Sequence, residues 1–129
     1  MKILVVDDEA DVRTLFEQRF RREIRSGEFA FSFAYSGEEA LEYLHGHVSE
    51  VVLILSDINM PGMSGLELLR RVKQEYAAPP PLPPLVMMIT AYGDTDSYNQ
   101  AMQLGANDFL TKPVDFAALK QKLVALEKR

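Results

Sequence analysis

Apolar and polar residues follow one another in five similar blocks along the chain, each a short apolar run followed by a longer amphipathic segment. Uninterrupted apolar runs of this length are typical of strands buried on both faces of a sheet, and apolar residues at a spacing of three to four indicate helices. We expect strands at residues 2–6, 29–34, 51–55, 85–89 and 108–110 and helices at 9–25, 36–44, 66–72, 94–104 and 116–126.

Local signals support two of these boundaries. Ser26-Gly27 supplies a stop for the first helix, because glycine readily ends a helix in the left-handed conformation. Ser36 to Glu39 has the spacing of a capping box, in which the serine and glutamate side chains satisfy free backbone amides at a helix start.

The regular alternation of strand and helix predicts an α/β fold. Strands separated by helices form a parallel sheet with right-handed crossovers, covered by helices on both faces. The fold class is therefore a doubly wound α/β sandwich, and we take the flavodoxin-like strand order 2-1-3-4-5 for its five strands. The length of 129 residues predicts a single domain, residues 1–129.

Composition narrows the chemistry. The net charge of −5, without a run of like charges, argues against direct nucleic-acid binding. The absence of cysteine excludes disulfides and thiolate metal sites, so an oxygen-bound cation is the metal to expect. The apolar start at residues 3–6 is too short for a signal peptide or a membrane span. We expect a cytoplasmic protein that is neither secreted nor inserted in a membrane.

Polar residues gather at one edge of the predicted sheet. Ligands of doubly wound sheets bind outside the carboxyl ends of the strands, where the strand order reverses. With neighbouring strands about 4.8 Å apart, Lys112 lies roughly 10 Å from Asp57, a gap that a lysine side chain largely covers. The residues at these strand ends are Asp7, Asp8, Asp57, Thr90 and Lys112.

Three carboxylates in one crevice repel one another unless a cation is present. Mg²⁺ suits the position, because it prefers oxygen ligands and is commonly held by one or two carboxylates together with a phosphate. Three carboxylates, one ammonium and one dication sum to zero charge, which would admit a phosphoryl group. Asp57 is the natural nucleophile, since carboxylates can form aspartyl-phosphate intermediates.

The chain resembles the receiver domain of response regulators, the CheY-like family of two-component signalling, from start to finish. Four fragments carry the likeness, each ending a predicted strand: Leu4 to Glu9, Asp57 to Gly65, Thr90-Ala91 and Gly105 to Pro113. Four such fragments in the right order are far more specific than any one of them.

The resemblance implies a role for each site residue. Asp57 would accept a phosphoryl group from a sensor histidine kinase or phosphotransfer protein. Mg²⁺ would be bound by the side chains of Asp8 and Asp57, by the backbone carbonyl of Asn59 and, through water, by Asp7. Lys112 would contact the phosphoryl oxygens, and the Lys112–Pro113 peptide bond would be cis. The protein would not be an enzyme beyond catalysing its own phosphorylation and dephosphorylation.

The family's switch would involve Thr90 and Phe109. The Thr90 hydroxyl would move towards the phosphate and Phe109 would rotate inward, remodelling the face made by the helix 94–104, the strand 108–110 and the helix 116–126. That face would serve a homodimer, a partner protein or an output domain outside this chain. Phe109 departs from the commoner tyrosine and cannot make its hydroxyl hydrogen bond. Asn59 and Tyr92 would be the places to look for control of the phosphate lifetime.

Each feature also has a structural interpretation. The Asp7-Asp8 pair has the chemistry of a helix N-cap, Thr90 fits the end of a strand, and Lys112-Pro113 fits a turn. Residues 77–84 carry five prolines and are interpreted as a stiff loop, although their P-x-x-P spacing suits an aromatic groove. We interpret His45, His47 and the basic stretch Arg19 to Arg25 as solvated.

Two other classes of function remain open. A small Mg²⁺-dependent phosphohydrolase would also use an aspartyl nucleophile, but Asn59 stands where a general acid would be sought, and no cap domain is evident. A flavodoxin-like cofactor binder would need a glycine-rich phosphate loop, which follows none of the strands. The sequence does not decide whether the chain is a stand-alone regulator or a part of a longer one.

Overall fold

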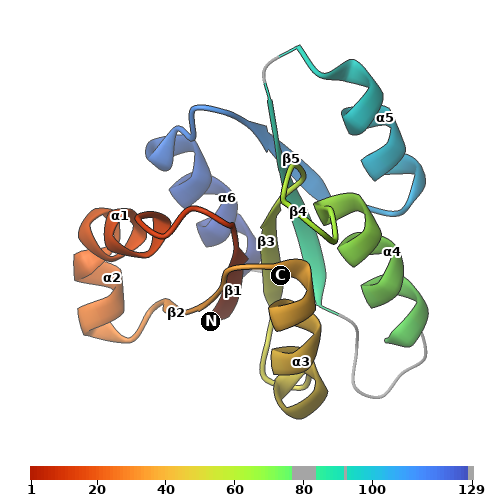
Figure 1. The fold of residues 1–129 in the computed structure, drawn as a ribbon. Helices are drawn as coiled ribbons and strands as arrows, with labels where there is room; N and C mark the ends of the chain where they lie inside the picture. Colours follow the sequence, from red (N-terminus) through yellow and green to blue (C-terminus); the bar gives the residue numbers. More distant parts are fainter. Residues whose placement is uncertain (77–83, 92, 128–129) are drawn as a thin grey trace.

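The protein is built on a five-stranded parallel sheet with the order β2-β1-β3-β4-β5 (Figure 1). A computed structural model describes residues 1–76, 84–91 and 93–127. The predicted parallel sheet and its strand order are confirmed. The strands are β1 (Lys2–Val6), β2 (Ala30–Ala34), β3 (Leu53–Asp57), β4 (Leu85–Thr90) and β5 (Asp108–Thr111).

Helices cover both faces of the sheet, as predicted. α1 and α2 pack with α6 on one face, and α3, α4 and α5 cover the other (Figure 1). Within the described residues, none of the helices combines the length and apolarity needed to cross a membrane. The helices are α1 (Val12–Arg19), α2 (Arg21–Ser26), α3 (Gly37–His47), α4 (Gly65–Glu75), α5 (Thr95–Gln103) and α6 (Phe116–Glu127).

The apolar strands explain why two cores form. Successive residues of a strand point to opposite faces, so Ile3 and Val5 enter the core below α1 and α6, while Leu4 and Val6 enter the core below α3 and α4. Each of these four side chains is almost completely buried. The core on the α1 side is rich in phenylalanine rings packed at tilted or edge-to-face angles.

The predicted helix at 9–25 is wrong in two respects. The helix begins at Val12 and is divided at Phe20, which leaves the helical conformation with φ −113° and ψ 24°. The Phe20 ring is buried against Phe16 and Phe29. We attribute the break in the helix to this packing of the ring in the core. The second segment, α2, ends at Gly27, whose φ of 82° is left-handed, as the predicted stop requires.

The third strand lies two residues later than predicted. Val51 is buried, but its amide is hydrogen-bonded to the Val48 carbonyl in the turn that follows α3. The apolar run therefore includes a core residue of a turn, and pattern alone does not separate it from the strand.

Two polar segments are less solvated than predicted. Glu23, within the basic stretch, is buried because its carboxylate pairs with Lys120 of α6 at 2.6 Å, and this contact lowers the pKa of Glu23. His47 stacks on Tyr43 and lies 2.8 Å from its carbonyl oxygen, whereas His45 is exposed as predicted. Except for Pro84, the proline-rich segment lies outside the described residues, as does Tyr92.

The start of α4 lies very close to the end of β3. Ser64 caps the helix by accepting a hydrogen bond from the Glu67 amide, and the Gly65 amide donates to the Ile58 carbonyl at 2.8 Å. A Cβ atom on Gly65 would lie 2.1 Å from the carbonyl oxygen of Asp57. Only glycine fits here, because the contacting atom belongs to the backbone of the strand.

We therefore expect Gly65→Ala to lower the free energy of unfolding by about 2 kcal/mol or more, since the added methyl group must displace backbone. Gly46→Ala is the matched control, because a Cβ there meets nothing within 4 Å and alanine favours the helix. Urea unfolding of both variants measures the difference. Equal stabilities for Gly65→Ala and the wild type would contradict the close approach.

Candidate acidic site at the carboxyl ends of the strands

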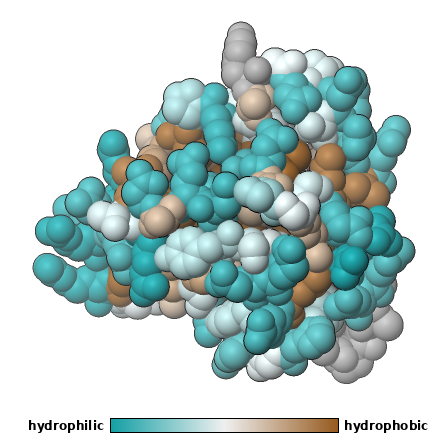
Figure 2. Space-filling view, in the orientation of Figure 1, coloured by the Kyte–Doolittle hydropathy of each residue, from teal (hydrophilic) through white to brown (hydrophobic). Residues whose placement is uncertain are grey.

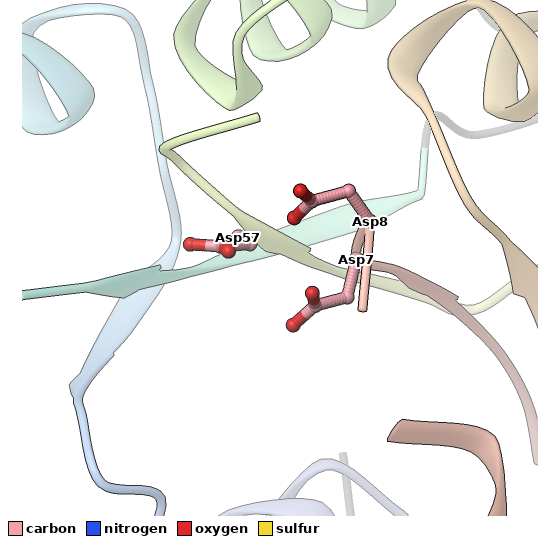
Figure 3. A group of neighbouring side chains, drawn as sticks. All are labelled: Asp7, Asp8 and Asp57. Atoms are coloured by element: carbon pink, nitrogen blue, oxygen red, sulfur yellow. The ribbon is translucent and has the colours of Figure 1, made fainter. Parts of the chain in front are cut away.

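Three carboxylates converge where β1 and β3 end side by side. Asp57 is the last residue of β3, and Asp7 and Asp8 follow β1 directly. One oxygen from each of the three side chains lies within 4.8 Å of the others. Figure 3 shows these carboxylates gathered at one edge of the sheet. The structure thus brings together the acidic residues that the sequence placed at neighbouring strand ends.

Asp57 is the most enclosed member of the group, with 2% of its surface exposed. Its Oδ2 accepts a hydrogen bond from Lys112 Nζ at 2.9 Å, and its Oδ1 accepts one from the Asn59 amide at 3.4 Å. Lys112 thus spans the gap from beyond β5, across β4, to the end of β3. A buried carboxylate with a single ammonium partner keeps oxygen lone pairs available for another cation.

The loop after β5 holds Lys112 in position. The Lys112 amide donates to the Thr90 carbonyl at 2.8 Å, which continues the pairing of β5 with β4. The Lys112–Pro113 peptide bond is cis. The hydrogen bond to Thr90 holds the backbone of Lys112 against the end of β4, and the side chain extends from that point to Asp57.

Burial and charge act on the ionisable groups of the site in opposite directions. The pKa of the Asp7 carboxyl is raised, mainly by burial and also by the negative charge of Asp57, while the Glu9 amide partly offsets this. Burial lowers the pKa of Lys112, but the hydrogen bond and charge of Asp57 outweigh it, and the net shift is upward. Burial and the charge of Asp57 thus disfavour the ionised form of Asp7, and Lys112, which pairs with Asp57, offsets only part of this effect.

The donor set fits a hard divalent cation. Three carboxylates and one ammonium leave a formal charge of −2, which one divalent ion balances. The ligands are all oxygen atoms, and Asp8 is exposed, so the site is open to solvent on one side. Asn59 lies in the loop directly after Asp57, with its amide already directed at that carboxylate.

Thr90 and Phe109 lie together beside this site. Thr90 ends β4 with 2% exposure, and Phe109 is partly buried on β5. Both residues line one cavity of about 210 Å³ together with Tyr98 of α5. The rings of Phe109 and Tyr98 meet edge to face, with centroids 4.4 Å apart. Sequence reasoning missed Tyr98, because α5 is polar and its few apolar residues define no clear stripe.

A second hollow lies between α1, the end of β1 and the loop after Lys112, and we name it the site-edge hollow. Its volume is about 580 Å³, and it places apolar surface next to the acidic site. This feature was also missed, since it depends on contacts between a helix and a distant loop that spacing does not reveal. Its apolar lining includes Val12, Leu15, Phe16, Pro113 and Phe116.

A doubly wound sheet with three carboxylates and a lysine at the carboxyl ends of its strands defines a class of α/β domains with an acidic site that could bind a metal ion. The chain belongs to the response regulator receiver domain family, whose family model matches residues 3–124. Receiver domains are signalling domains of two-component systems rather than classical enzymes. The predicted family is therefore confirmed.

Individual proteins show the same likeness. The chain is 32% identical over 129 residues to the response regulator RppA of Synechocystis sp., covering all of this chain and 51% of RppA. It is 40% identical over 123 residues to the response regulator protein PilR of Pseudomonas aeruginosa, covering 93% of this chain and 24% of PilR. The chain thus spans about half or less of these two regulators.

A solved structure agrees with the fold. The crystal structure of a response regulator receiver domain protein from Clostridium thermocellum superposes with a TM-score of 0.81 at 27% sequence identity. The match covers 97% of this chain and 92% of that one.

The raised pKa of Asp7 leads to a prediction. Without metal, Asp7→Asn should raise the free energy of unfolding at pH 7 by about 1 kcal/mol, the scale on which active-site substitutions often stabilise proteins. The pKa of the Asp7 carboxyl is raised in the folded state above its ordinary value of 3.8. Ionisation of Asp7 therefore lowers the free energy of unfolding progressively as the pH rises above 3.8. The advantage of the variant should therefore vanish in acid.

Urea unfolding at several pH values, with and without Mg²⁺, measures this effect, and saturating Mg²⁺ should reverse the order of the two proteins. Asp11→Asn is the control, because it removes the same charge from an exposed N-cap without a side-chain hydrogen bond. A metal-free Asp7→Asn protein less stable than wild type at pH 7 would contradict the assigned repulsion.

Proposed function

We propose that this receiver domain is a phosphoacceptor switch of a two-component phosphorelay and that Asp57 is the residue phosphorylated. The observation that carries the proposal is the environment of the Asp57 carboxylate. It is buried, faces two further carboxylates, and has Lys112 as its counter-ion at 2.9 Å. In this position the Asp57 carboxylate can act as a nucleophile, and the Lys112 ammonium can stabilise the negative charge of the incoming phosphoryl group.

Asp8, Asp57 and the backbone carbonyl of Asn59 would bind Mg²⁺, and Asp7 would bind it through water. The fit rests on the oxygen-only donors, the formal charge of −2 and the exposure of Asp8, which leaves room for the water ligands that Mg²⁺ retains. When bound, Mg²⁺ would neutralise negative charge that develops on a phosphoryl group during its transfer.

The reaction follows from the positions of the protein groups. An oxygen of the Asp57 carboxylate attacks the phosphorus of a phosphohistidine, an O–P bond forms and the P–N bond breaks. The histidine leaves with the electrons of that bond and takes up a proton from solvent. Lys112 would then exchange one oxygen of Asp57 for an oxygen of the phosphoryl group, because its flexible stem lets the ammonium follow the charge.

The change at Asp57 would be transmitted through Thr90 and Phe109. Thr90 ends the strand next to Asp57, and its hydroxyl would turn to the phosphoryl oxygens. The cavity that Thr90 shares with Phe109 and Tyr98 offers space for the Phe109 ring to move inward. That movement would alter the face of α5, β5 and α6, which we assign to dimerisation, partner binding or control of an output domain.

The donor would be a sensor histidine kinase or phosphotransfer protein, and the protein would catalyse only its own phosphorylation and dephosphorylation. The two regulators compared above are at least about twice as long as the match, so an output domain joined to a receiver is the arrangement we favour. We also propose a cytoplasmic location for the protein.

The test is the intact mass of the purified protein after incubation with acetyl phosphate, with and without Mg²⁺. We expect one added phosphoryl group that requires Mg²⁺ and is absent in Asp57→Asn. Asp96→Asn is the control, because Asp96 is an exposed aspartate of the first turn of α5 and should label like the wild type. Labelling that persists in Asp57→Asn, or a folded wild type that never labels, would refute the proposal.

A further inference from the structure

A large basic hollow lies at the far end of α1 from the acidic site. Its volume is about 720 Å³, and it is formed by the end of α1, by α2 and by one residue of α6. Hydrophilic side chains project over α1 and α2 at the left of Figure 2, whose view matches Figure 1. We name it the basic hollow, and its charged lining consists of Arg19, Arg21, Arg22, Glu23, Arg25 and Lys120.

The arginines of the basic hollow have no carboxylate partner in the part of the chain that the structure describes. The one carboxylate present, Glu23, is buried and already paired with Lys120 at 2.6 Å. By contrast, Arg70 and Arg71 of α4 both pair with Glu67 on their own helix. Several arginines without an ion pair around one hollow form a cationic surface, and nearby glutamates balance its charge only in part.

Two of the cations are held in place. The Arg19 guanidinium lies over the Phe116 ring at 5.5 Å, and Lys120 is fixed by the buried Glu23 carboxylate. Both contacts join the α1–α2 pair to α6, so the walls of the hollow are tied together. Held cations lose less conformational freedom when an anion binds than free surface side chains do.

The charge of the chain is strongly divided. The hollow carries five cations and one carboxylate, a formal charge of +4, and the chain as a whole carries −5, so the other residues together carry −9. A nucleic acid has about one charge per 1.7 Å of duplex and would run past the hollow onto that acidic remainder. A short acidic segment of a protein can end beside these cations and so avoids that repulsion.

The basic hollow and the site-edge hollow adjoin each other at Arg19, which lines both. α1 connects them, and its eight residues span about 12 Å at 1.5 Å per residue. One partner helix lying along α1 can therefore reach the apolar surface beside Lys112 and the arginines at the same time. The acidic end and the basic end of this surface would also fix the direction in which that helix lies.

We propose that the basic hollow binds a carboxylate-rich segment of the protein that delivers the phosphoryl group to Asp57. The identity of that partner rests on the function proposed above, whereas the preference for a carboxylate-rich protein segment rests on the hollow itself. The arginine forks engage the glutamate or aspartate side chains of the segment, and the apolar part of the same partner covers the site-edge hollow.

The probe is a fluorescein-labelled helical peptide with three glutamates on one face, compared with the same peptide carrying glutamines. We expect Arg21→Gln/Arg25→Gln to weaken binding of the glutamate peptide about tenfold, as the loss of two exposed charges implies. Arg70→Gln/Arg71→Gln removes the same charge from α4 and should leave the affinity unchanged. ¹⁵N spectra should place the shifted amides at residues 18–26 and Lys120.

Equal weakening by the two double variants, or failure of the glutamate peptide to bind better than the glutamine peptide, would overturn the proposal. Tighter binding of inorganic tripolyphosphate or of anionic phosphatidylserine vesicles than of the peptide would also overturn it, in favour of a phosphate ligand or a membrane surface. Labelling with acetyl phosphate needs no docking partner and is expected to be unchanged in both double variants. Failure to label would therefore count against the proposed function alone.

Discussion

The contact between the Asp57 carboxylate and the Lys112 ammonium joins the carboxyl ends of two strands, β3 and β5, which are separated by β4. Burying an ionised carboxylate costs several kcal/mol unless a cation and hydrogen bonds compensate it. Asp57 is almost fully enclosed, so its position depends on a lysine that must arrive from beyond β5. The pairing of Lys112 with the end of β4 and the close packing of Gly65 on β3 both serve to keep this geometry.

The ion pair with Lys112 does not remove the repulsion among the three carboxylates of the site. Asp7 and Asp8 face Asp57, and the pKa of Asp7 is raised by burial and by the charge of Asp57, although Lys112 offsets part of this shift. A fold selected for stability alone would replace one of them with a neutral residue. Retaining all three carboxylates makes sense when a divalent cation and a phosphoryl group take part, because the same charges then become ligands and balance.

The sheet and the location of the site could be predicted because both depend on local pattern. Apolar runs predict the strands, and their alternation with helices predicts a parallel sheet, for which we took the flavodoxin-like strand order. The polar residues that end the runs must then meet at the carboxyl ends of the strands. The division of α1 from α2 at Phe20 could not be predicted, since it depends on where a ring packs in the core. The pairing of Glu23 with Lys120 joins residues 97 positions apart in a contact that no spacing records.

The arrangement of α1 gives the molecule a surface with two chemical characters. Its beginning lies beside the acidic site and apolar side chains, and its end leads into a set of arginines. The difference between the two ends of this surface arises from the packing of the helices. The sequence of the basic stretch alone indicates only an ordinary solvated helix face. Recognition and phosphoryl transfer would thus be placed along one helix, with orientation set by charge.

We propose that Asp57, its acidic neighbours and Lys112 act as one phosphoryl-binding unit. A crystal structure of the protein with Mg²⁺ and beryllofluoride, which mimics a phosphoryl group on aspartate, tests this directly. We expect beryllium bonded to an Asp57 oxygen, a metal ion held by Asp8 and Asp57, and Lys112 Nζ in contact with a fluoride. A complex in which beryllofluoride is bound elsewhere, or in which Lys112 contacts no fluoride, would contradict it.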